Sequence, residues 1–193
     1  MRGVRLVVRG PWPVVLLALV LASCSEKPKP LPVFNTVPDF VLTAQTGHEF
    51  RKQFLDGKIW VADFIFTTCP GPCPRMTAQM RQIGAEVKDL PQVDLVSFTV
   101  DPKTDTPAVL SEYAGRFKAE TDRWHFLTGP QETLHLMMRS AFMLGDVNGA
   151  LTHSTRFVLV DAHSRVRGYY ETTDPEALKR LVADIRRLAR GNS

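Results

Sequence analysis

Two cysteines that could carry chemistry lie four residues apart in the segment Cys69-Pro70-Gly71-Pro72-Cys73-Pro74. A residue that precedes a proline is pushed away from helical geometry, so we expect this segment to form a stiff loop. Cys73 is expected next to the N-terminus of a helix with Pro74 at its first position, where the backbone dipole favours a thiolate. Two thiolates on a short rigid loop can close a disulfide or bind a soft metal ion.

Two other roles for the cysteine pair fit the sequence less well. A structural zinc site usually has four protein ligands, and only two cysteines are available in this loop. An inert disulfide more often connects distant segments of a chain. The pair therefore indicates redox chemistry or metal binding.

A metal held by two thiolates needs a further ligand, and the chain has five histidines: His48, His125, His135, His153 and His163. His48 and His163 stand in expected turns and are predicted to be solvated. His125 in a short strand and His135 on a helix are predicted to be partly buried and satisfied. His153 and His163 flank the strand expected at 155–160, so at ~3.3 Å per residue they lie at its opposite ends. Only one of them can meet the cysteines, and the start of this strand makes His153 a candidate ligand.

Strands and helices alternate along the rest of the chain. Strands are expected at 58–66, 93–100 and 124–127, with hairpins over 39–50 and 155–170. Helices are expected after the cysteines, after Asp105-Thr106-Pro107, over 131–144 and after Asp174-Pro175. This order predicts an α/β fold, a thioredoxin-like three-layer sandwich with a mixed central sheet.

The N-terminal region predicts export and a lipid anchor. Residues 1–23 combine a basic lead with a short apolar run, as in a signal peptide, and Cys24 follows Leu21-Ala22-Ser23. This tetrad resembles the bacterial lipobox, whose cysteine is acylated; the alternative is a plain secretory signal before an incidental cysteine. Residues 24–37 are then the lipidated cysteine with a proline-rich, extended tether, and residues 38–190 are the thioredoxin-like domain. We expect a membrane-anchored lipoprotein that faces the periplasm or the cell exterior.

The charge of the mature chain argues against nucleic-acid binding. Three of the 24 basic residues, Arg2, Arg5 and Arg9, precede the apolar run, and without them 21 basic residues face 20 acidic ones. A nearly neutral chain lacks the basic patch that such partners require. We expect a monomer that binds no nucleic acid.

Several segments together resemble the Sco/SenC family of thioredoxin-fold factors that help to assemble the copper centre of cytochrome oxidase. They are the Cys-x-x-x-Cys-Pro loop, the stretch Val100-Asp101-Pro102 with Asp105-Thr106-Pro107, and the later His153-Ser154 before a strand. The resemblance spans residues 38–188 and implies that Cys69, Cys73 and His153 bind copper, as Cu(I) or Cu(II). Many members have an acidic residue directly before the histidine, where this chain has Thr152.

The resemblance also suggests residues that support the ligands. Asp63 lies six residues before Cys69, the offset of the buried aspartate of thioredoxins, and such a carboxylate could accept a proton in thiol–disulfide exchange. The alternative is an aspartate near a solvent-facing strand end. Asp101 and Asp105 are expected to turn and cap the chain, and the alternative is that both shape the rim of the site. Asp101 is a further candidate for support behind the ligands.

The resemblance implies a copper metallochaperone whose partner is the copper-accepting subunit of cytochrome c oxidase. The alternative is an enzyme, a thiol–disulfide oxidoreductase that reduces the cysteines of that subunit, and Cys69 and Cys73 would then be its catalytic pair. A peroxidase or redox sensor is a third interpretation. Because disulfide exchange needs no imidazole and three-coordinate copper does, His153 favours copper.

Overall fold

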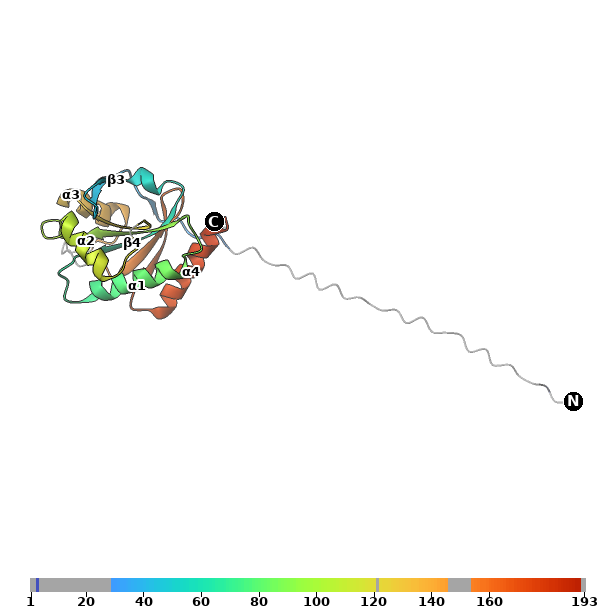
Figure 1. The fold of residues 1–193 in the computed structure, drawn as a ribbon. Helices are drawn as coiled ribbons and strands as arrows, with labels where there is room; N and C mark the ends of the chain where they lie inside the picture. The colour runs from blue at the N-terminus through green and yellow to red at the C-terminus, as the bar shows by residue number, and fades with distance from the viewer. Residues whose placement is uncertain (1–2, 4–28, 121, 146–153, 192–193) are drawn as a thin grey trace.

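A mixed β-sheet lies at the centre of the computed structural model, which describes residues 3, 29–120, 122–145 and 154–191 (Figure 1). Within these residues the sheet has eight strands in the order β1-β8-β7-β4-β5-β6-β2-β3. The strands are β1 (Asn35–Thr36), β2 (Val41–Ala44), β3 (Glu49–Arg51), β4 (Ile59–Ile65), β5 (Val93–Thr99), β6 (Trp124–Thr128), β7 (Arg156–Val160) and β8 (Arg165–Glu171).

The directions of the central strands bring several chain ends to one edge of the sheet. β4, β5 and β6 run parallel, with Ile65 beside Thr99. β7 runs antiparallel to β4, with Trp60 opposite Val160. The C-terminal ends of β4 and β5 and the beginning of β7 therefore share one edge, called here the loop edge, and the turn from β7 to β8 lies at the opposite edge.

Helices cover both faces of the sheet and complete the predicted three-layer sandwich. One face carries α1 (Pro72–Glu86), α2 (Pro107–Arg116) and α4 (Pro175–Ala189), and the other carries α3 (Gln131–Leu136) with its π-helical continuation Met137–Ala141 (Figure 1). A short 3-10 helix spans Lys52–Leu55. Alternate side chains of β4 serve the two layers, so Val61 packs with α1 and Trp60 packs on the α3 side. All seven residues of β4 are buried, as expected for a central strand.

Two helices differ from the sequence prediction. α1 begins at Pro72, two residues earlier than expected, since the fixed φ and missing N–H of proline suit the first helical position. Cys73 therefore lies inside the first turn of the helix. The segment expected as one helix over 131–144 is α-helical only to Leu136 and π-helical from Met137 to Ala141.

The segment before the predicted domain boundary at Pro38 contacts the fold. β1 pairs with β8, and Val37 is buried. The buried guanidinium of Arg167 donates hydrogen bonds to the carbonyl oxygens of Leu31 (2.7 Å) and Pro32 (2.9 Å). Residues 31–37, assigned to the tether on composition, therefore dock against the sheet. Among the described residues, no helix is long and apolar enough to cross a membrane.

Candidate metal centre

The cysteine loop leaves β4 at the loop edge. A turn follows Ile65, in which the N–H of Cys69 donates to the carbonyl oxygen of Phe66 (3.2 Å). Cys69 and Cys73 are both free thiols, with 6% and 0% of their surface exposed. The structure thus brings the two predicted cysteines together on one short turn and the helix that follows it.

The sulfur of Cys69 receives the hydrogen bonds at the beginning of α1. It accepts from the backbone N–H groups of Gly71 and Cys73 and from the Cys73 thiol. Burial alone would raise the pKa of Cys69, but these hydrogen bonds outweigh burial and lower the pKa below its ordinary value. Cys69 is therefore the cysteine of the pair that favours the thiolate form.

Cys73 has the opposite character. Burial raises the pKa of Cys73 to about 12, helped by the hydrogen bond that its thiol makes with Cys69. The expectation that the helix dipole favours a thiolate at Cys73 is therefore wrong. The early start of α1 is the reason, because it turns the Cys73 side chain into the core with Met76 and Met80 and leaves the free amides for Cys69.

The first turn of α1 is also tied to α2. The carbonyl oxygen of Cys73 accepts a hydrogen bond from Thr77 Oγ1 (2.9 Å), and that hydroxyl lies 2.8 Å from the phenolic oxygen of Tyr113. With the Thr77 proton donated to the Cys73 carbonyl, Tyr113 is the donor of the second bond. Both side chains are buried, so this chain of hydrogen bonds holds the backbone of Cys73 in place.

The predicted third ligand, His153, lies outside the described residues. Within residues 29–120, 122–145 and 154–191, no group of three or more His, Cys, Asp or Glu side chains gathers that could hold a metal. The direction of the strand that follows His153 favours the predicted ligand. β7 is antiparallel to β4, so Arg156 at its beginning lies at the loop edge. His163, in contrast, is exposed in the turn at the opposite edge, where its N–H donates to Asp161 (2.9 Å).

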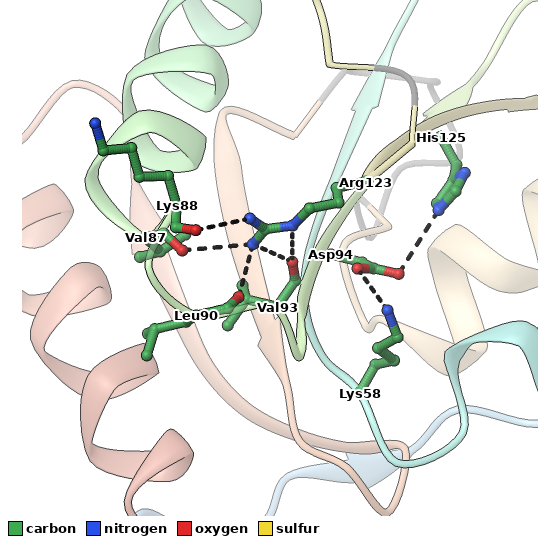
Figure 2. A network of polar contacts seen from close by, with 8 residues as sticks. All are labelled: Lys58, Val87, Lys88, Leu90, Val93, Asp94, Arg123 and His125. Atoms are coloured by element: carbon green, nitrogen blue, oxygen red, sulfur yellow. Dashed lines mark hydrogen bonds and ion pairs between the residues drawn. The ribbon is translucent and has the colours of Figure 1, made fainter.

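The other three histidines lie in the turn, the strand and the helix that the sequence predicted. His48 is exposed in the turn of the β2–β3 hairpin. His125 packs against Phe50 in a tilted arrangement, with ring centroids 4.7 Å apart, and its Nε2 lies 3.7 Å from the buried carboxylate of Asp94. Figure 2 shows this contact together with the ion pair of Asp94 with Lys58 (3.1 Å). His135 is half-buried on α3, but its Nε2 has no hydrogen-bond partner within the described residues, so the prediction that it is satisfied is wrong.

Asp63 is a fully buried carboxylate on β4. In the strand register it lies beside Ser97 of β5, and neither carboxylate oxygen meets the distance and angle limits of a hydrogen bond within the described part of the chain. Burial raises the pKa of Asp63 to about 7, an effect that the Ser97 hydroxyl partly offsets. The solvent-facing alternative for Asp63 is therefore wrong. Its charge in turn raises the pKa of Cys73, so the two groups share one electrostatic environment.

Asp101 and Asp105, the two aspartates after β5, make different contacts. Asp101 is half-buried and contributes through its backbone, since its N–H donates to Thr99 Oγ1 (3.0 Å). Asp105 is completely buried, and its carboxylate accepts hydrogen bonds from Thr67 and Thr99. The sequence predicted Asp101 as support behind the ligands, and it predicted Asp105 as a residue of the helix start that, like Asp101, could shape the rim of the site. Only the structure reveals that Asp105 reaches the cysteine loop.

The asymmetry of the cysteines makes a prediction about their reactivity. In the reduced protein at pH 7, iodoacetamide should modify Cys69 at least tenfold faster than Cys73, because the thiolate is the nucleophile. Mass spectrometry of the separated peptides measures both rates. In a Cys73→Ser variant the pKa of Cys69 should change, since a serine hydroxyl replaces the thiol that bonds to it. Faster modification of Cys73 would contradict the helix register described above.

Asp63 makes a prediction about stability. Its pKa is about 7 in the folded protein against 3.8 for the ordinary group, so between pH 4 and 7 the unfolded chain ionises first and stability falls as pH rises. The loss amounts to roughly 3 to 5 kcal/mol, from about 1.4 kcal/mol per pKa unit. Asp63→Asn cannot titrate and should lack this loss. Urea unfolding of the reduced proteins at pH 4.5, 6 and 8 measures the difference.

Asp89→Asn is the control for this experiment. A hydrogen bond from Arg186 lowers the pKa of that exposed carboxyl, so its contribution has the opposite sign and should be small. A constant difference between wild type and Asp63→Asn at every pH would mean that Asp63 is ionised in the folded protein.

Comparison with known proteins gives a consistent result. The SCO1/SenC family model matches residues 29–190. A crystal structure of a SCO1/SenC family lipoprotein from Bacillus anthracis is 36% identical, covers 84% of this chain and 98% of that one, and has a TM-score of 0.74. A structure of BsSco, described as a member of the Sco family of cytochrome c oxidase assembly proteins with a disulfide switch, is 29% identical, covers 83% and 97%, and has a TM-score of 0.73.

A relative in Stutzerimonas stutzeri, whose name proposes copper binding, is 30% identical over 166 residues, which are 80% of this chain and 79% of that protein. The family model covers nearly all of the described residues, and the structural likeness extends over most of the chain. The chain therefore belongs to the SCO1/SenC family.

Proposed function

We propose that this protein binds one copper ion through Cys69, Cys73 and His153 and delivers it to the copper-accepting subunit of cytochrome c oxidase. The observation that carries the proposal is the pair of free thiols at the start of α1, on the edge of the sheet where β7 begins. The relative whose name proposes copper binding and the relative assigned to oxidase assembly agree with it.

The donor set suits copper as cargo. Thiolate and imidazole are soft and intermediate ligands, and two thiolates with one imidazole match the low coordination number of Cu(I). Cu(II) would require a fourth donor, such as water. The lowered pKa of Cys69 provides one thiolate without a large cost, whereas Cys73, with a pKa of about 12, must release a proton when metal binds.

We also propose that the domain works outside the cytoplasm, held by lipid on Cys24. The tetrad that ends in Cys24 supports this, as does the description of the Bacillus anthracis relative as a lipoprotein. Mass spectrometry of the protein extracted from membranes should find a mature N-terminus at Cys24 that carries diacylglycerol. An unmodified N-terminus elsewhere, or a free Cys24 thiol, would contradict the anchor.

A thiol–disulfide oxidoreductase is the second candidate, because of Asp63. In that reaction the Cys69 thiolate attacks a disulfide of the partner, and Cys73 then attacks the mixed disulfide. The partner leaves with two thiols, and a Cys69–Cys73 disulfide remains. Cys73 must lose a proton in the second step, and Asp63 is the buried carboxylate whose charge acts on it. The relative described as having a disulfide switch also supports this second candidate.

Replacing the two histidines that flank β7 separates the two candidates. His153→Ala should weaken Cu(II) binding at least tenfold and change the Cu(II) absorption spectrum, because one ligand is lost. The same variant should still form the Cys69–Cys73 disulfide, since imidazole takes no part in sulfur exchange. Equilibrium competition with a chelator measures the affinity, and thiol titration measures the disulfide.

His163→Ala is the matched control, because His163 sits at the far end of the same strand. Its spectrum, stoichiometry and affinity should equal those of wild type. Loss of copper from the His163 variant with retention in the His153 variant would remove His153 from the site. Wild-type protein that exchanges disulfides but binds no copper would favour the oxidoreductase.

A further inference from the structure

The carboxylate of Asp105 joins two loops that are far apart in the sequence. It accepts hydrogen bonds from the backbone N–H of Thr67 (3.1 Å) and from Thr67 Oγ1 (2.5 Å), two residues before Cys69. It also accepts from Thr99 Oγ1 (2.5 Å) at the end of β5. One side chain therefore links the exits of two neighbouring parallel strands.

The loop that carries Asp105 is itself well fixed. The N–H groups of Thr104 (3.2 Å) and Asp105 (2.9 Å) both donate to the carbonyl oxygen of Asp101. Thr99 Oγ1, which donates to Asp105, accepts from the N–H of Asp101 (3.0 Å). Thr106 then caps α2 by accepting from the N–H of Val109 (3.4 Å). Asp105 is thus held from its own side and can act as an anchor for the cysteine loop.

Burying a carboxylate is costly unless hydrogen bonds replace the lost water. Asp105 has no exposed surface, and its three strong donors come from Thr67 and Thr99. Hydrogen bonds to a charged acceptor are about twice as strong as neutral ones and more sensitive to geometry. The position of Thr67 is therefore dictated by the carboxylate. With it the carboxylate dictates the turn over residues 66–69, which the Cys69 N–H closes on the carbonyl oxygen of Phe66 (3.2 Å) just before α1 begins at Pro72.

We propose that Asp105 is the positioning residue of the cysteine site: its carboxylate fixes the turn before Cys69 so that the Cys69 sulfur meets the N-terminus of α1. Asp105 touches neither sulfur; it acts through Thr67. The copper part of this inference rests on the proposed function, whereas its thiol part does not.

Asp105→Asn tests the proposal. The amide keeps the size of the side chain but replaces one acceptor oxygen with a donor group that faces other donors. We expect the equilibrium constant for thiol–disulfide exchange of the Cys69–Cys73 pair with glutathione to change at least fivefold. We also expect Cys69 to react with iodoacetamide at least threefold more slowly at pH 7. Copper affinity should fall at least tenfold.

Asp94→Asn is the matched control, since Asp94 is another buried aspartate, on the same strand as Thr99 but away from the cysteine loop. It lies at the other end of β5, paired with Lys58 and His125 (Figure 2). This variant should lose stability as well but keep the exchange constant and the Cys69 rate of wild type. Thr67→Val is the second test variant; it removes only the hydroxyl donor and should shift both readouts in the same direction as Asp105→Asn.

The outcomes decide the inference without reference to copper. If folded Asp105→Asn and Thr67→Val keep wild-type exchange constants and Cys69 rates, Asp105 serves stability alone and the proposal is wrong. An equal shift in Asp94→Asn would also overturn it. If Asp105→Asn does not fold, Thr67→Val gives the decision. A wild-type protein that binds no copper would refute the proposed function and leave the thiol measurements to test Asp105.

Discussion

The parallel pairing of β4 with β5 and the antiparallel pairing of β7 with β4 determine where chemistry can occur in this protein. Parallel strands end at the same edge of a sheet, so the cysteine loop after Ile65 and the aspartate loop after Thr99 must be neighbours. The opposite direction of β7 brings its beginning to that edge as well. Residues from three distant parts of the sequence meet because of strand direction alone, before any side chain is considered.

At this edge the N-terminus of α1 gives the two cysteines of one motif opposite pKa shifts. Unpaired amides at the start of α1 favour negative charge on the sulfur that faces them, which is Cys69, and burial disfavours it on Cys73. The charge of Asp63 raises the pKa of Cys73 further. An asymmetric pair suits both candidate functions, since metal binding and disulfide exchange each begin from one thiolate. The electrostatics therefore explain the different reactivity of the two cysteines. Whether His153 serves as a further ligand decides between copper binding and disulfide exchange.

Much of this architecture was predictable from local patterns. The buried run of β4, the hairpin of β2 and β3 and the start of α2 after Asp105 follow from hydrophobic periodicity, turn residues and caps, and the pairing of cysteine with proline marked the loop. The sequence could suggest a place for Asp105 at the rim of the site but not its contact with Thr67, because the two residues are 38 positions apart and only strand pairing brings them together. The helix dipole favours a thiolate at Cys69 because α1 begins two residues earlier than predicted. Sequence patterns do not locate the first residue of a helix that accurately.

Copper X-ray absorption spectroscopy of the one-to-one complex, prepared anaerobically from the reduced protein, tests the central claim most directly. It counts the sulfur atoms bound to the metal. If Cys69 and Cys73 hold the ion together, the wild-type protein should show two sulfur donors, and a Cys73→Ser variant should show one. A wild-type spectrum with nitrogen and oxygen donors only, or an unchanged sulfur count in the variant, would contradict the site.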